Sequence, residues 1–337
     1  MKKNIKKLIL LLISFVFLYF VFVNLDIKEL IHIIKRFNIL YIPLLCLSII
    51  TSLSLRGLCF KQLISKTAKI SLFDAALLCI TGAALNVVLP ARAGDIFRAY
   101  YFGQKYKIDK IKVFGTVMLE RIFDIIVIFC LLCSGVFIYH ENQIAMNLCI
   151  LAGIILIAGV AFAIITYKYN KTDKICGFIE AKSRNLPFAE LTKNLINFIN
   201  KLCNSFFAGF EVIDSPKRTL YALFASFGIW FFECMNFLIV IYGFGYNIHW
   251  SVTIFIISFI ALACMIPSTS IFIGPYQLAV ITAFSIYNIN KETALAISFV
   301  EQAIVTLTTA FIAFLFMLKN NISYKELKED IEEEIEE

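Results

Sequence analysis

The sequence predicts an all-α fold, a polytopic bundle of membrane-spanning helices, and three observations support this prediction. Hydrophobic residues fill 60% of the 337 positions and charged residues only 16%, whereas a soluble domain has roughly 45–50% and about 25%. The apolar residues form runs that approach the roughly 20 residues that a transmembrane helix needs. The Lys and Arg residues gather between these runs, as is typical of the loops of a membrane protein.

Uninterrupted and interrupted apolar runs together predict a bundle of about six to eight transmembrane helices. The uninterrupted runs cover residues 8–23, 39–58, 113–138, 144–167, 219–243 and 292–318. The interrupted runs are 70–89, which Pro90 ends, and 251–287, which Pro267 and the pair Gly274-Pro275 break. Because irregular backbone at membrane depth has to be shielded by protein, we expect the interrupted runs to be broken or re-entrant segments inside the bundle.

The distribution of basic residues predicts how the chain is oriented. Lysines precede the first apolar run, so the amino terminus is expected in the cytoplasm. The segments 61–69 and 92–112 are both rich in Lys and Arg. Because they flank the run 70–89, that run is expected to enter and leave the membrane on one side. We therefore expect one domain over residues 1–318 in the cytoplasmic membrane and a cytoplasmic charged tail over residues 319–337.

Charged side chains also stand within and beside the apolar runs, where each costs several kcal/mol near the centre of a bilayer. The candidate residues in the first half of the chain are Arg92, Gly94, Asp95, Arg98, Glu120, Arg121 and Asp124. Arg92 and Arg98 carry forked donors that suit phosphate, and Glu120 and Asp124 are spaced to share a helix face. These residues therefore predict a polar site for a lipid headgroup. The alternative is that the charges neutralise one another and only fix helix packing.

A second group of candidate residues lies near the carboxyl end. Pro267 and Gly274 supply irregular backbone at membrane depth, and Glu301 interrupts the last apolar run. The order of the two groups is similar, since Pro90 precedes a span that carries Glu120 and Pro267 precedes a span that carries Glu301. Broken segments at corresponding places in two halves of a chain are typical of transporters with inverted repeats.

The sequence offers little for other chemistries. It contains no nucleotide-binding glycine loop, no nucleophile elbow and no histidine-rich cluster, so we expect no metal, no cofactor and no nucleic acid partner. The net charge of +7 is assigned to loops that set topology. Glu233 and Glu301 are lone acids in apolar runs, and either a structural partner or a functional role remains open for each.

The motifs resemble the transmembrane domain family of lysylphosphatidylglycerol synthases, also called the flippase-like membrane domain family. The resemblance covers nearly the whole chain. It rests on a proline with an Arg-x-Gly-acid-x-x-Arg run, a Glu-Arg-x-x-Asp helix start, a late broken segment and an acid in the final span. The matching residues are Pro90, Arg92, Gly94, Asp95, Arg98, Glu120, Arg121, Asp124, Pro267, Gly274 and Glu301.

The resemblance implies a flippase-like lipid transporter of the cytoplasmic membrane. Its cargo would be an anionic or modified lipid, such as an aminoacylated, glycosylated or isoprenoid-phosphate lipid, and the motif residues would bind the headgroup. Since the soluble aminoacyl-transferase domain of the family's synthases does not follow, we expect no enzymatic activity. Two alternatives remain. The chain could be a scaffold or accessory subunit of a lipid or cell-envelope synthase, or a membrane-embedded enzyme acting on a lipid phosphate with Glu120 or Asp124 as base.

Overall fold

The computed structural model describes residues 25–88, 93–138, 215–263, 274–285 and 287–320, together with residues 21, 23, 147, 150, 153 and 154. Within these residues the secondary structure is entirely helical, which confirms the predicted class. The predicted runs 8–23 and 144–167 lie almost wholly outside the described part of the chain, and so do Pro90, Arg92 and Pro267. Most of the expected tail also lies outside it.

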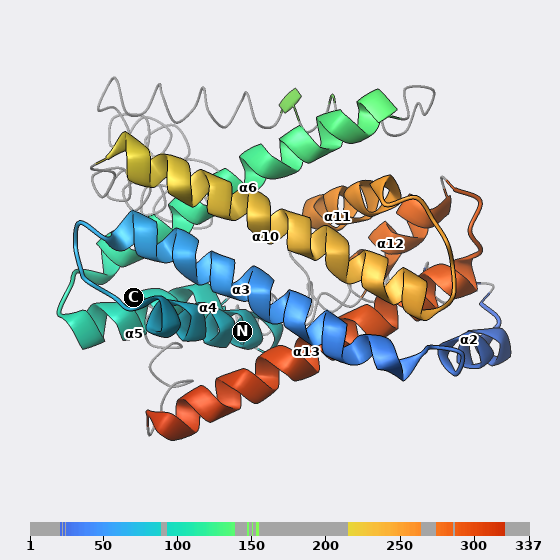
Figure 1. Ribbon diagram of the computed structural model, residues 1–337, viewed down its shortest axis with the longest axis horizontal. Coiled ribbons are helices and arrows are strands. Elements are labelled where there is room, and N and C mark those ends of the chain that lie inside the picture. Colours follow the sequence, from blue (N-terminus) through green and yellow to red (C-terminus); the bar gives the residue numbers. More distant parts are fainter. Residues whose placement is uncertain are drawn as a thin grey trace, which may run out of the picture.

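Long helices form the frame of the molecule (Figure 1). They are α3 (Ile42–Ile64), α6 (Lys110–Ile138), α10 (Pro216–Gly243) and α13 (Lys291–Lys319). Among the described residues, three helices are long and apolar enough to cross a membrane, and they cover Ile39–Ile64, Pro216–Gly243 and Lys291–Lys319. The first includes a short 3-10 turn, η1 (Ile39–Tyr41), that leads into α3. These helices correspond to apolar runs that the sequence predicts as spans.

The first interrupted run belongs to a hairpin of two helices, α4 (Leu72–Val88) and α5 (Ala93–Tyr106). Hydrogen bonds join the limbs near the turn, because the Asn86 amide group donates to Asp95 at 3.3 Å and the Asp95 backbone N–H donates to Asn86 at 3.2 Å. The hairpin is larger than expected, since 72–88 is one unbroken helix and α5 is the return limb. The single glycine at position 82 does not break this helix.

The second interrupted run is broken as predicted. It contains two short apolar helices, α11 (Ser251–Ala263) and α12 (Pro275–Ser285), of 13 and 11 residues. Each is shorter than the roughly 20 residues of a spanning helix, and the two pack against each other (Figure 1). Gly274 has a φ of 105°, which glycine adopts readily, and Pro275 follows at the helix start, where its missing N–H costs nothing.

The elements occur twice in the same order. A long helix, a hairpin of two shorter helices and a second long helix make up both α3 to α6 and α10 to α13. The closing helices α6 and α13 are both 29 residues long. Each carries a buried acid ten residues after its first residue, Glu120 in α6 and Glu301 in α13. The described part of the chain thus consists of two halves with one plan.

The two halves run in opposite directions. Figure 1 shows α3 and α10 side by side and antiparallel. Phe37, just before α3, contacts Gly243 at the end of α10, whereas Leu55 in the later part of α3 contacts Gly228 in the earlier part of α10. An inverted pair of this kind places corresponding elements of the two halves at opposite ends of the long helices.

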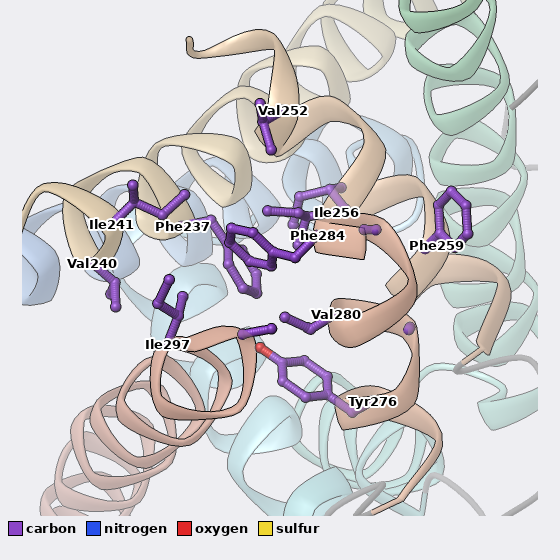
Figure 2. Packing of buried hydrophobic residues seen from close by; sticks show 14 of the residues in the cluster. Phe237, Val240, Ile241, Val252, Ile256, Phe259, Tyr276, Val280, Phe284 and Ile297 are labelled. Carbon is purple, nitrogen blue, oxygen red and sulfur yellow. The ribbon is translucent and has the colours of Figure 1, made fainter. Parts of the chain in front are cut away.

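Hydrophobic side chains hold the second half together. Figure 2 shows part of the cluster that α10, α11, α12 and α13 form around Phe237, Ile256 and Phe284. A smaller cluster joins the start of α13 to α2 (Ile27–Ile34), an amphipathic helix capped by Asp26. Because lipid tails are as apolar as these side chains, close van der Waals packing and not exclusion of water is what holds such helices together inside a bilayer.

Candidate functional site

A buried ion pair joins the first hairpin to α6. Arg98 of α5 donates to both carboxylate oxygens of Glu120, at 2.9 and 3.0 Å, and each side chain is only 1% exposed. The ring of Phe60 lies 4.9 Å from the Arg98 guanidinium carbon. Two parallel bonds of this type are the strong, geometrically specific form of an arginine–carboxylate contact. Both terminal nitrogens of Arg98 are therefore already engaged.

A second set of ion pairs surrounds Arg121. Its guanidinium donates to Asp95 at 2.9 and 3.0 Å and to Asp124, one turn further along α6, at 3.1 Å. Arg56 of α3 donates to the same Asp124 oxygen at 3.0 Å. Two arginines thus contact one oxygen of Asp124. Arg98 and Arg121 each have a carboxylate that they do not share with Arg56, whereas Arg56 has only the shared Asp124.

Helix α10 completes the polar cluster. The other oxygen of Asp124 accepts hydrogen bonds from the Trp230 indole at 2.9 Å and from the Ser226 hydroxyl at 3.3 Å. Further along the same helix, Glu233 accepts from Ser52 of α3 at 2.7 Å and from Asn236 at 3.4 Å. No arginine, lysine or histidine among the described residues forms an ion pair with Glu233.

These side chains border a cavity of about 280 Å³, which is close to the lower end, about 300 Å³, of typical small-molecule sites. Its lining comes from six helices of both halves: Ile49, Leu53, Arg56, Cys79, Ala83, Asn86, Val87, Asp95, Arg98, Arg121, Glu233, Asn236, Val305 and Thr309. The lining combines a cationic group of arginines with the carboxyl and amide groups of Glu233 and Asn236. It therefore offers both donors and acceptors to a ligand.

Some polar atoms around the cavity lack partners within the described part of the chain. They are the Nε atoms of Arg98 and Arg121 and the amide oxygen of Asn236. An unsatisfied buried donor or acceptor costs about 1–3 kcal/mol. No set of three or more His, Cys, Asp or Glu residues in the described segments is arranged to hold a metal ion.

The structure gathers most of the site predicted in the first half of the chain. Asp95, Arg98 and Arg121 line the cavity, and Glu120 and Asp124 pair with arginines of its wall. Gly94 lies where α4 and α5 cross, and any side chain there would collide with the carbonyl oxygen of Gly82. Gly94 is needed for this close approach of two backbones. Arg92 lies outside the described residues.

Glu301 and Gly274, two predicted residues of the second half, do not line the cavity. Glu301 accepts a hydrogen bond from the hydroxyl of Tyr276. The Gly274 amide donates to the Gln277 side chain at 2.8 Å and helps to begin α12. Pro267 is outside the described residues. Glu301 and Gly274 are thus separate from the arginine cluster.

Among the residues of the cavity wall that sequence reasoning missed are Arg56, Asn86 and Asn236, and it left the role of Glu233 open. A signal for Arg56 is present, because it is the only charged residue in the run 39–58. A charge in such a run is costly and usually faces a polar interior. The asparagines carry no comparable signal, since an amide in an apolar helix is common enough to pass unnoticed.

A bundle of long apolar helices around a cavity with charged and apolar lining defines this chain as a multi-pass membrane protein. The chain belongs to the family described as the lysylphosphatidylglycerol synthase TM region, whose family model matches residues 7–313. This membership confirms the family to which the motifs point.

Two archaeal proteins of Methanocaldococcus jannaschii are similar to the chain. UPF0104 membrane protein MJ1595 is 25% identical over 333 residues, covering 94% of this chain and 95% of the relative. UPF0104 membrane protein MJ1078 is 26% identical over 216 residues, covering 63% of this chain and 84% of the relative. No solved structure matches the chain.

Proposed function

We propose that the chain is a lipid transporter of the cytoplasmic membrane that carries a polar headgroup through the cavity while the acyl chains stay in the bilayer. The observation that supports this most is the polar cavity of about 280 Å³ enclosed by apolar helices of both halves. A charged group in hydrocarbon is costly, and arginines and amides around a cavity replace the water that the headgroup loses. The cargo would be an anionic phospholipid or a modified lipid of the aminoacylated, glycosylated or isoprenoid-phosphate kind.

Arg56 is the best candidate ligand for the lipid phosphate. A guanidinium has five N–H donors, and Arg56 uses one of them in its contact with Asp124. Its side chain is 14% exposed, against 1% for Arg98. Arg121, which is 26% exposed, is the natural second ligand. A phosphate in the cavity would therefore be bound by the arginines of α3 and α6, and Arg98 would act as a structural support of the site.

The inverted arrangement of the halves supports transport over passive lipid binding. In transporters built from inverted repeats, the substrate site lies near the midplane at the interface of the repeats. The cavity here is lined from both halves, by α3 to α6 on one side and by α10 and α13 on the other. The expected orientation has a cytoplasmic amino terminus. In this orientation the basic ends of α5 and α6 contact anionic headgroups at the inner surface.

Lipid flux in proteoliposomes tests the proposal. Purified full-length protein would be reconstituted into vesicles of phosphatidylethanolamine and phosphatidylglycerol that contain a tail-labelled phosphatidylglycerol, and bleaching of the outer leaflet would report exchange between leaflets. The double variant Arg56→Gln/Asp124→Asn removes the ion pair between these residues and also the ion pair of Arg121 with Asp124, while Arg121 keeps its ion pair with Asp95. We expect it to slow exchange by about tenfold or more, because a hydrogen bond to a charged group contributes roughly 1.5–3 kcal/mol.

The matched control for this experiment is Arg36→Gln, which removes an exposed arginine outside the cavity. It should exchange lipid at the wild-type rate. Exchange that is equally fast in protein-free vesicles, or in the double variant and the wild type, would contradict the proposal.

A scaffold for a synthase is the second candidate, and the balanced charges of the cluster favour it. Arg56, Arg98 and Arg121 face the carboxylates of Asp95, Glu120 and Asp124 in mutual ion pairs. Such a network can simply fix helix packing. Purification of the chain with a synthase subunit, together with no lipid exchange by the chain alone, would favour this role. We propose no enzymatic step for either role.

A further inference from the structure

Glu301 is a buried carboxyl group with no cation beside it. Its residue is 5% exposed, and the hydroxyl of Tyr276 on α12 donates a hydrogen bond to it. No Arg, Lys or His in the described segments forms an ion pair with it. The titratable groups that act on it there are Tyr276 on α12 and Glu233 on α10. Glu233 is an acid and does not favour an ionised Glu301, whereas the hydrogen bond from the Tyr276 hydroxyl is compatible with either state of the Glu301 carboxyl group.

The surroundings of this pair are apolar. Figure 2 shows Tyr276 at the edge of the cluster that contains Phe237, Val280 and Ile297, with its hydroxyl turned toward α13. An isolated carboxylate is so costly in an apolar medium that the group takes up a proton instead. Glu301 is therefore expected to be neutral in the structure described.

The first half of the molecule provides an internal comparison. Glu120 stands at the same position of α6 as Glu301 does of α13. In each half, the return limb of the hairpin supplies the partner of the acid, Arg98 for Glu120 and Tyr276 for Glu301. The partner of Glu120 is a cation, whereas the partner of Glu301 is a neutral hydroxyl. The fold thus places an ion-paired acid and an acid without a counterion at equivalent sites.

Glu301 is also connected to the cavity. Val305 and Thr309 follow it by one and two turns on α13 and line the cavity wall. Glu233, which lines the same wall, is close enough to Glu301 for the two carboxyl groups to interact electrostatically. Arg56 attracts Glu233 but makes its ion pair with Asp124. Glu233 is therefore a second acid at the cavity wall that is near enough to exchange a proton with Glu301.

We propose that Glu301 is a proton-binding site whose loading and release accompany movement of the headgroup through the cavity. The O–H bond of the neutral Glu301 breaks, Glu233 or solution takes the proton, and the reverse transfer reloads the site. The coupling to lipid rests on the proposed transport function, whereas proton binding by Glu301 does not.

Infrared difference spectroscopy of the reconstituted full-length protein tests the proton site without any lipid assay. At neutral pH we expect a carbonyl stretching band of a protonated carboxyl group, which an alkaline titration removes. The band should be absent in Glu301→Gln. It should persist in Glu292→Gln, a partly exposed acid on the same helix. In Tyr276→Phe it should move to higher frequency, because the hydrogen bond to the carbonyl oxygen is lost. A spectrum unchanged by Glu301→Gln would overturn the proposal.

Lipid exchange across an imposed pH gradient tests the coupling, with the vesicles of phosphatidylethanolamine and phosphatidylglycerol described above. We expect the gradient to change the exchange rate of the wild type and of Glu292→Gln, and to leave the rate of Glu301→Gln unchanged. If the wild type exchanges lipid but ignores the gradient, the coupling is wrong. If it exchanges no lipid at all, the transport function fails, while the infrared band still decides whether Glu301 binds a proton.

Discussion

At the scale of single residues, the arginines of the cluster divide into structural and available ones. Arg98 is enclosed and doubly bonded to Glu120, whereas Arg56 and Arg121 share Asp124 and keep part of their surface open. Burial removes water from a charge, and the free-energy cost of losing this water is offset only when charged and hydrogen-bonding partners replace it. The most deeply buried arginine is thus the one with both terminal nitrogens bound to one carboxylate, and the less buried ones are those left for a ligand.

Loss of one partner of the buried pair should destabilise the protein. Glu120→Gln leaves the Arg98 guanidinium without its counterion, and we expect a cost of about 3–5 kcal/mol. Thermal unfolding of the detergent-solubilised protein, followed by fluorescence-detected size exclusion, measures it as a lowered melting temperature.

The control for this prediction removes the pair as a whole. Arg98→Met/Glu120→Leu should recover most of the stability, since replacing both partners by apolar groups is often neutral or better. An exposed acid on α2 serves as a second control, because Glu29→Gln should melt with the wild type. A melting curve of Glu120→Gln that superimposes on that of the wild type would show that the pair is not a support of the fold.

At the scale of elements, the hairpins determine where polar groups face the interior. The crossing of α4 and α5 is close enough for Asn86 of one limb to bond Asp95 of the other. This closeness depends on Gly94 and Gly82, which lack the side chains that would separate the backbones. A short side chain at the crossing would move Asp95 and Arg98 away from their partners.

The glycine crossing gives a prediction at this scale. Gly94→Ala places a methyl group against two backbone atoms, the carbonyl oxygen of Gly82 and the nitrogen of Asn86. Neither is a flexible side-chain end, so we expect a loss of stability of about 1–3 kcal/mol or more and a smaller yield of monodisperse protein. Both quantities are measured by size exclusion before and after heating.

Gly228→Ala on α10 is the matched control for the glycine crossing. Its new methyl group would meet the end of the Leu55 side chain at 2.9 Å, which can turn aside. Alanine also favours the helical state over glycine by about 1 kcal/mol. This variant should remain as stable as the wild type. If Gly94→Ala and Gly228→Ala lowered stability equally, the close approach of α4 and α5 at Gly94 would not be the cause of the loss.

At the scale of the whole molecule, the two halves have one plan and opposite directions. The antiparallel pair α3 and α10 forms the central contact between them (Figure 1). Both halves supply side chains to the wall of the cavity. Antiparallel halves place the starts of α6 and α13 at opposite ends of the bundle. If the bundle spans a membrane, these helix starts face opposite compartments.

Labelling of introduced cysteines tests this arrangement. In a variant that lacks the ten native cysteines, Lys112→Cys marks the start of α6, and Glu29→Cys marks α2, which packs against the start of α13. We expect a membrane-impermeant maleimide to label Glu29→Cys in intact cells and Lys112→Cys only after permeabilisation. The reverse result would mean that the whole orientation is inverted, and labelling of both sites from one side would contradict the inverted halves.

The sequence by itself determined the membrane class, the all-helical fold, most spans within the described residues and the break between α11 and α12. These properties depend on local composition, because a run of apolar residues prefers hydrocarbon and a Gly-Pro pair begins a new helix wherever it lies. The same holds for the motif around Asp95, Arg98, Glu120, Arg121 and Asp124, since charges placed in apolar surroundings stand out in any reading of the chain.

Only the tertiary structure decided which charges meet. The pairing of Arg98 with Glu120, the arrival of Arg56 at Asp124 and the separation of Glu301 from all of them depend on helices that are distant in sequence. The return limb of the first hairpin was also misplaced by sequence reasoning, since basic residues indicate the membrane side of a loop but not the residue at which the chain reverses. Periodicity and composition are local quantities, whereas an ion pair requires two particular helix faces to come together, and packing alone selects those faces.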